Sequence, residues 1–190
     1  VEATARLFPR SISVREPQSD RTFEVEDAMF ADSTAHEVLG FDFLQGDPAT
    51  ALDQPFSVVL TDETAQRIFG DQNPMGRQLQ FANQAVFTVS GVVRKFPEQS
   101  HLRIGLLAPF RNIPDAEPAS ARDNVRNAMT HNWLASYTTT YVLLKQGAGA
   151  ADANALFPGF LKQFGDPKFI DKQAFSLFPV RDIHLHSTAT

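Results

Sequence analysis

Hydrophobic and polar residues alternate with different periods along the chain, and the changes of period predict where strands give way to helices. Residues 23–26 alternate Phe, Glu, Val, Glu, which is the period of two of a half-buried strand. Residues 5–15 form a second strand beside it, across a turn at residues 16–20 that contains a proline. A short helix is expected within residues 33–44, before the turn that Gly-Asp-Pro forces at residues 46–48.

The middle of the chain combines a capped helix with a hairpin. Residues 57–60 form a short β-branched strand, and Thr61, Asp62 and Glu63 then supply an N-cap and first-turn acids that favour a helix. That helix ends at Gly70, a residue free to adopt the left-handed cap conformation. Two apolar strands at residues 79–81 and 86–93 predict a hairpin.

The last third of the chain mixes both kinds of element. The elements expected there are a strand at residues 104–110, a polar helix at 115–127, a strand at 137–144, a helix at 150–164 that Pro158-Gly159 must kink or restart, and a strand at 175–180. Strands and helices alternate irregularly and several connections are hairpins. The pattern therefore predicts an α+β fold rather than a doubly wound sheet.

Composition places the chain among folded proteins. Its 190 residues are 43% hydrophobic and include 17 Phe, which is enough for one compact unit or two small lobes. No apolar run approaches the roughly 20 residues of a membrane-spanning helix, and no signal peptide opens the chain. Because the first residue is Val1 and not Met, we expect a segment cut from a longer protein.

Charge and cysteine content exclude several kinds of partner and chemistry. The formal net charge is −5 and the basic residues form no block, which argues against nucleic acid as a partner. The chain has no cysteine, so thiolate catalysis and Cys-based zinc sites are excluded.

Motifs that suggest chemistry fail on inspection. Residues 70–77 lack the spacing, the lysine and the hydroxyl of a phosphate-binding loop, and are interpreted as a helix cap and turn. His184 and His186 share a face if they lie on a strand, but no third metal ligand is near. Ser100 and His101 are adjacent, which suits a turn better than a nucleophile and its base.

Carboxylates and aromatic residues also have simpler structural roles. Each candidate acid fits a turn, a cap or a solvated face, and no acid/base pair stands out among Asp32, Glu37, Asp42, Asp47, Asp62 and Glu63. Trp133, Tyr137 and Tyr141 could form an aromatic ligand platform, although such residues usually pack in a core. We therefore assign no catalytic, cofactor-binding or metal-binding residue, and the substrate-binding residues stay unknown.

The order of several short motifs resembles the periplasmic core domain of MacB-type and FtsX-type ABC transporter permeases. The matching residues are Ala31-Asp32, Phe41-Asp42-Phe43-Leu44-Gln45-Gly46-Asp47-Pro48, Ser57-Val58-Val59-Leu60-Thr61, Ala65, Phe69-Gly70, Asn73-Pro74-Met75-Gly76, Phe87-Thr88-Val89-Ser90-Gly91-Val92, Phe96-Pro97, Ser100-His101, Trp133, Thr140-Tyr141-Val142-Leu143-Leu144 and Pro179-Val180-Arg181-Asp182-Ile183-His184-Leu185. Single motifs are weak, whereas their order and spacing are specific. Residues 116–130 carry no match, and Ala35-His36 stands where many relatives have aromatic residues.

The resemblance implies an architecture and a setting. It implies a discontinuous Porter-like β-α-β lobe from residues 1–33 plus 131–190, and an inserted, mixed α/β Sabre-like lobe from residues 34–130. The domain would lie on the periplasmic side of the cell inner membrane, between the first and second transmembrane helices of a permease. Its partners would be the transmembrane part, an ABC ATPase subunit, a second permease in a dimer and an envelope protein. ATP hydrolysis would belong to a separate subunit or domain, and no cofactor is expected.

Three functions follow for such a domain. The first is mechanotransmission, in which the domain relays conformational change from the ATPase and contacts substrate or envelope partners. The second is a soluble envelope module without a transport role, which binds a ligand or protein in a cleft between the lobes. The third is an envelope hydrolase that uses His101, His184 or His186, and it requires a clustered site with perturbed titration.

Overall fold

One mixed β-sheet organises the chain in the computed structural model, which describes residues 1–81, 85–131, 137–168 and 170–183. The strands are β1 (Ala3–Arg15), β2 (Phe23–Ala31), β3 (Phe43–Gln45), β4 (Ser57–Thr61), β5 (Gln78–Phe81), β6 (Val86–Val93), β7 (Leu106–Pro109) and β8 (Thr139–Leu143). The α-helices are α1 (Ala35–Leu39), α2 (Asp62–Phe69), α3 (Arg122–His131), α4 (Ala150–Asn154) and α5 (Phe157–Phe164). Short 3-10 helices are η1 (Phe110–Asn112), η2 (Pro114–Ala116), η3 (Ile170–Lys172) and η4 (Val180–Asp182).

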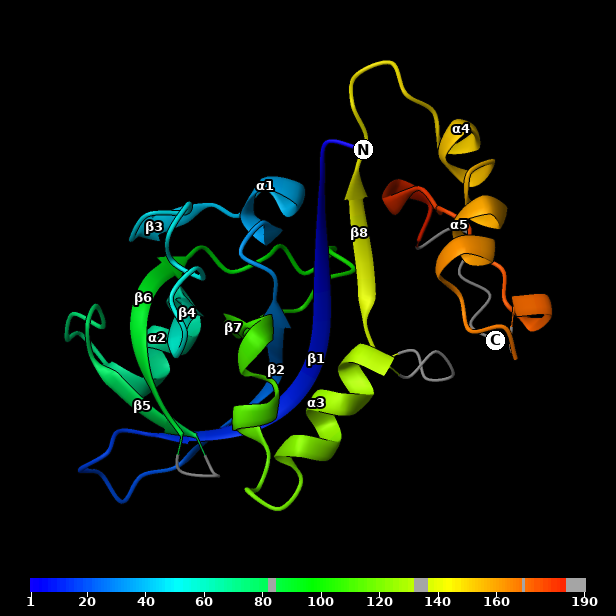
Figure 1. Cartoon of the computed structure of the whole chain (residues 1–190). Helices are drawn as coiled ribbons and strands as arrows, with labels where there is room; N and C mark the ends of the chain where they lie inside the picture. Colours follow the sequence, from blue (N-terminus) through cyan, green and yellow to red (C-terminus); the bar gives the residue numbers. More distant parts are fainter. Residues whose placement is uncertain (82–84, 132–136, 169, 184–190) are drawn as a thin grey trace.

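The strand pairings close on themselves. The order is β2-β7-β4-β6-β5-β1-β8, and β1 also pairs with β2, so six strands form a continuous circuit with β8 outside it (Figure 1). Strands β2 and β7 are parallel, as are β4 and β6, and the other pairs are antiparallel. The α+β prediction is confirmed. Strands from both predicted lobes share the sheet, and the division into residues 1–33 plus 131–190 and 34–130 stays a prediction.

Strand β1 joins β8 to the closed part of the sheet. One edge of this 13-residue strand pairs with β2. The other edge pairs first with β8, over residues 3–7, and then with β5 through Val14 and Arg15. Pro9 lies in the stretch between these two pairings, where the described chain provides no second strand and a proline is tolerated.

Apolar side chains cover both faces of the central strands. Alternate residues of a strand point to opposite faces, and in β4 the side chains of Val58 and Leu60 belong to one buried cluster whereas Val59 belongs to another. Strand β7 divides in the same way between Leu106 and Leu107. All five residues of β4 are buried, which explains why its middle residues, Val58, Val59 and Leu60, form a continuous apolar run and not an alternating pattern.

The helices differ from prediction where prolines intervene. Helix α2 begins and ends where the sequence indicates, with Thr61 as its N-cap and Gly70 as its C-cap. The helix expected at residues 115–127 begins only at Arg122. Before it, η2 ends at Ala116, and the next residue, Glu117, has an extended backbone (φ −101°, ψ 156°). This conformation is the one that Pro118 imposes on the residue preceding it.

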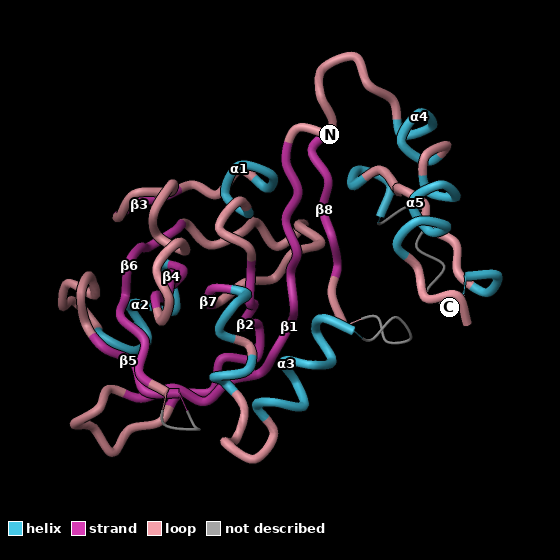
Figure 2. Tube along the Cα trace, viewed as in Figure 1, coloured by secondary structure: helices cyan, strands magenta, loops and turns pink. Residues whose placement is uncertain are grey.

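The chain beyond β8 packs against itself. The prediction of a strand at residues 175–180 is wrong. Figure 2 shows α4 and α5 beyond β8, away from the closed part of the sheet. The helix break occurs before Phe157, because Pro158 occupies the first turn of α5, where it is tolerated. The backbone N–H of Leu177 donates to Asn154 Oδ1 at 2.7 Å and not to a neighbouring strand. The ring of Phe175 instead packs against Phe157, with centroids 6.0 Å apart.

Candidate functional site

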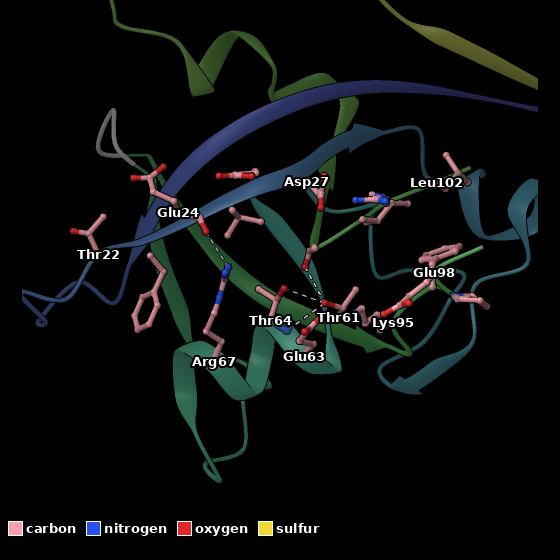
Figure 3. A pocket seen from close by; sticks show the side chains of 18 residues that line it. Thr22, Glu24, Asp27, Thr61, Glu63, Thr64, Arg67, Lys95, Glu98 and Leu102 are labelled. Atoms are coloured by element: carbon pink, nitrogen blue, oxygen red, sulfur yellow. Dashed lines mark hydrogen bonds and ion pairs between the residues drawn. The ribbon is translucent and has the colours of Figure 1, made fainter. Parts of the chain in front are cut away.

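A groove of about 970 Å³ opens beside the first half of β2. It lies between β2, the N-terminal half of α2 and the segment at residues 95–105 that leads into β7 (Figure 3). The residues that line it are Thr22, Phe23, Glu24, Val25, Glu26, Asp27, Thr61, Glu63, Thr64, Arg67, Lys95, Phe96, Pro97, Glu98, Leu102, Arg103, Ile104 and Gly105.

Thr61 closes one end of the groove by joining α2 to the start of β7. Its hydroxyl accepts a hydrogen bond from the Thr64 backbone N–H at 3.2 Å, and its own N–H donates to the Gly105 carbonyl at 3.1 Å. The Gly105 N–H donates in turn to the Asp27 carbonyl at 2.8 Å. A Cβ on Gly105 would meet Val25 Cγ1 at 3.0 Å, so this end is tightly packed.

The wall opposite α2 is a strand edge. Residues 23–25 of β2 pair with β1 on one side. On the other side β7 pairs only from Ala28 onward, so within the described chain no strand covers residues 23–26 there. Arg67 reaches across from α2, and its Nη2 donates to the Glu24 carbonyl at 3.0 Å (Figure 3). The groove therefore exposes backbone groups that a strand would otherwise satisfy.

The groove carries an excess of negative charge. Its lining contains five carboxylates, from Glu24, Glu26, Asp27, Glu63 and Glu98, against three cations, from Arg67, Lys95 and Arg103. Lys95 forms an ion pair with Glu63 at 2.8 Å, and the hydrogen bond to Glu63 raises the pKa of Lys95. Both side chains are solvated, so this pair contributes little to stability. The hydroxyls of Thr61 and Thr64, at the closed end, are hydrogen-bonded to each other at 3.0 Å and belong to the α2 cap.

Replacing Thr61 by Val is expected to lower the free energy of unfolding by about 1–2 kcal/mol, because the buried Thr64 N–H loses its acceptor. Urea unfolding of the isolated domain measures this change. Thr88→Val, at an exposed position on β6, is the matched control and should change stability by less than about 0.5 kcal/mol. Equal effects of the two substitutions would contradict the capping role.

The carboxylates considered from the sequence occupy caps, turns and solvated pairs, as expected. Asp47 Oδ1 accepts from the Ala49 N–H at 3.0 Å within its turn. Asp42 forms an exposed ion pair with Arg94 at 2.7 Å. Glu37 lies in the first turn of α1, and Asp62 and Glu63 lie in the first turn of α2. Glu63 borders the large groove, and Asp62 borders a second, smaller hollow between α2 and β3. The six carboxylates do not converge on one site.

Asp32 forms the most developed polar contact in the described chain. Its carboxylate accepts from the backbone N–H of Arg6 at 2.9 Å, from Arg6 Nε at 2.9 Å and from Arg6 Nη2 at 2.8 Å. Burial alone would raise the pKa of Asp32, but the hydrogen bonds from the side chain and backbone of Arg6 outweigh it and lower the pKa below the ordinary 3.8. The contact ties β1 to the end of β2.

Asp32→Asn is expected to reduce stability by about 1 kcal/mol at neutral pH, because the charged acceptor is lost. A carboxylate with a lowered folded-state pKa stabilises the fold above its unfolded-state pKa, and this contribution disappears as the pH falls through the folded-state value. The difference between wild type and variant should therefore be constant above about pH 5 and shrink below about pH 4. Unfolding at a series of pH values tests this, with the exposed Asp123→Asn as a control that should show no such trend.

The remaining predicted candidates do not form a reactive cluster among the described residues. Ser100 Oγ accepts from the Leu102 N–H at 3.1 Å, which is the turn chemistry expected. His101 Nε2 lies 3.1 Å from the hydroxyl of Tyr141, and Tyr141 is buried, so burial raises its pKa. Tyr137 is exposed, and the two tyrosines form no common platform. His184, His186 and Trp133 lie outside the described residues.

Metal sites and membrane spans are both absent from the part of the chain that the structure describes. Within those ranges, no group of three or more His, Asp or Glu side chains is placed to hold a metal ion. The same residues contain no helix with the length and apolar character needed to cross a bilayer.

The open edge of β2 could not be predicted from the sequence, because it depends on where β7 begins, some 80 residues later in the chain.

Comparison with known proteins gives a consistent result. A family model described as the MacB-like periplasmic core domain matches residues 1–158. A domain of a putative permease protein from Porphyromonas gingivalis superposes with a TM-score of 0.69 at 18% identity, over 90% of this chain and 73% of that one. The periplasmic region of MacB from Actinobacillus actinomycetemcomitans superposes with a TM-score of 0.64 at 15% identity, over 97% and 74%. A search of curated proteins found no match.

Proposed function

Because the chain belongs to the family of MacB-like periplasmic core domains, we propose that it relays conformational change between the membrane part of an ABC transporter permease and a partner in the envelope. Domains of this family are periplasmic parts of permeases, and the proposal assigns this one a mechanical role. In this proposal the domain faces the periplasm, the permease lies in the inner membrane as a dimer, and an ABC ATPase supplies the energy.

The observation that supports a relay is the course of β1. Its first residues pair with β8 near one end of the molecule, and its last residues pair with β5 inside the closed circuit. At about 3.3 Å per residue a strand of this length has a contour of roughly 40 Å, and it curves from β8 toward β5 (Figure 1). A continuous strand that is hydrogen-bonded along one edge transmits displacement with little bending, as a relay requires.

Side chains hold this strand to its surroundings at both ends and in the middle. Near the start, Arg6 binds Asp32 at the end of β2. In the middle, Arg10 forms an ion pair with Glu117, in the segment before α3. After its end, Glu16 accepts from Arg77, in the turn that precedes β5. The three contacts favour movement of β1 together with the sheet, because each joins it to a different element.

Inserting two glycines after Phe8 tests the relay. The insertion falls between the β8 and β5 pairings and within the ladder that β1 forms with β2, so it interrupts the strand there. In the full-length permease with its ATPase in proteoliposomes, wild type should show hydrogen exchange in this domain that differs between the nucleotide-free and vanadate-trapped states. The insertion should abolish that difference while basal ATP hydrolysis persists.

A disulfide provides the complementary variant. Thr4 and Val142 are directly paired across β1 and β8, and the chain has no other cysteine, so Thr4→Cys with Val142→Cys forms a defined cross-link. If β1 and β8 move as one unit, oxidation leaves the nucleotide-dependent exchange intact. Insertion of two glycines after Gly147, in the loop beyond β8, controls for added length. The relay is wrong if the insertion after Phe8 behaves like this control.

A further inference from the structure

We propose that the uncovered edge of β2 binds an extended, positively charged polypeptide segment by strand addition. This inference rests on the proposed function and deepens it, because it names the chemistry of the envelope partner and the place where that partner docks. The binding site is the groove beside residues 23–26 of β2.

The sheet divides at this point and leaves a track one strand wide. From Ala28 onward β7 fills the space between β2 and β4. Before Leu106 there is no strand in that space within the described chain, because β4 has already ended at Thr61 and the chain has turned into α2. Neighbouring strands lie about 4.8 Å apart, so a segment entering the groove would continue the line of β7 along β2.

The backbone of β2 is prepared for such a partner. Its pairing with β1 fixes residues 23–25 in extended conformation, with Phe23 opposite Val14 and Glu24 opposite Ser13. On the open side, the guanidinium of Arg67 donates to the Glu24 carbonyl, the kind of acceptor that the N–H of an added strand uses. The open edge includes the point where the register of β2 against β1 shifts, between Val25 and Ala28, and it faces a groove large enough for several residues.

Charge identifies the kind of segment. The exposed carboxylates of Glu24, Glu26 and Asp27 follow the edge itself, and Glu98 lies across the groove. Lys95 pairs with Glu63, which leaves four carboxylates of the groove lining against the two guanidinium groups of Arg67 and Arg103. The uncompensated charge along the edge is therefore negative, which favours a strand bearing Lys or Arg and disfavours an acidic one.

Titration of the 15N-labelled 190-residue chain with synthetic peptides tests the proposal. The probes are an octapeptide alternating lysine with valine and threonine, the same peptide with glutamate for lysine, and a lysine peptide N-methylated at every residue. The lysine peptide should shift the amides of residues 22–27 and 102–105 saturably and slow their hydrogen exchange. The glutamate and N-methylated peptides should bind at least about tenfold more weakly, because one lacks the charge and the other the backbone donors.

Charge reversal on the protein supplies the matched variants. Glu26→Lys with Glu98→Lys should weaken binding of the lysine peptide at least about tenfold. Glu2→Lys with Glu37→Lys makes the same change of net charge at exposed positions outside the groove, and it should leave binding unchanged. All four side chains are exposed, so the variants should fold.

Several results would overturn the proposal. These are the absence of saturable shifts along β2, equal binding of the N-methylated peptide, equal loss in both double variants, and concentration-dependent shifts of the same amides without peptide, which would make a second copy the occupant. The relay is tested separately by nucleotide-dependent exchange in the full-length permease. Failure of peptide binding would therefore leave that result unaffected, and failure of the relay would not remove peptide binding.

Discussion

Phe87→Ala should lower the free energy of unfolding by about 3–5 kcal/mol, a large part of the stability of a domain of this size. The ring is fully buried on β6 and stacks on Phe81 of β5, with centroids 4.0 Å apart and planes inclined by 14°. A second ring, that of Phe56, contacts it edge-on at 5.5 Å. The substitution therefore leaves a cavity lined by aromatic rings, which have few ways to move into it.

The position of the Phe87 ring means that its removal should also weaken the closure of the strand circuit. Phe81 pairs with Val14 of β1, so the stacked rings lie where the circuit of strands closes. Urea unfolding followed by circular dichroism measures the change, with Val86→Ala as the control. Val86 is the neighbouring residue on β6 but is 39% exposed, and its truncation should cost less than about 1 kcal/mol. Similar losses for Phe87 and Val86 would mean that the stacked pair does not support the closure.

Local patterns were sufficient to predict the elements whose signals lie within a few residues. The hairpin of β5 and β6 follows from two apolar runs separated by a short polar link. Helix α2 follows from Thr61 at its start and Gly70 at its end. Thr61 caps the helix as expected, whereas Gly70 has a positive φ of 61° but a ψ of −135°, which is not the left-handed helical conformation that was predicted. In each case the residues that decide the structure are neighbours in the chain, so one sequence is enough.

The sequence was misleading where an element depends on a distant partner. Residues 175–180 have the composition of a strand, but no described strand pairs with them, and Asn154 and the aromatic rings of α5 hold the segment instead. The groove shows the same limitation. Its lining comes from three separate parts of the chain, and the uncovered edge of β2 exists only because β7 is short. Period-two patterns indicate which residues can form a strand, not which edge will remain open.

The relay and the proposed docking groove meet at β1 and β2. Strand β1 pairs with β2 opposite the uncovered edge, through Val14 and Phe23, Ser13 and Glu24, and Ile12 and Val25. A displacement carried along β1 therefore changes the position of the groove wall directly, without an intervening loop. The register of β1 and β2 shifts between Arg10 and Ile12, next to the groove, which places the least regular part of the ladder beside the site.

The turn after β3 is the other position where a single substitution should have a large effect. Gly46 has a φ of 89°, which residues with a side chain rarely adopt. It also lies against β6, where a Cβ would be 2.4 Å from the Ser90 carbonyl oxygen and 2.9 Å from Gly91 Cα. Both atoms belong to the backbone of a central strand, so they cannot move aside as a flexible side chain would. The loop that follows buries Ala51 and Leu52 in the second apolar cluster, and displacing it would expose them.

Gly46→Ala should therefore cost about 2–5 kcal/mol, from roughly 1–2 kcal/mol of backbone strain and about 1–3 kcal/mol of steric displacement. Gly40→Ala separates the two contributions, because Gly40 has a similar φ of 68° but no atom lies within 4 Å of the position that its Cβ would take. Only the strain, about 1–2 kcal/mol, should appear in that control. Urea unfolding of both variants measures the difference, and amide exchange should increase at Ala51 and Leu52 in Gly46→Ala alone. Equal destabilisation by the two substitutions would show that strain accounts for the whole effect and that the approach of the turn to β6 tolerates a methyl group.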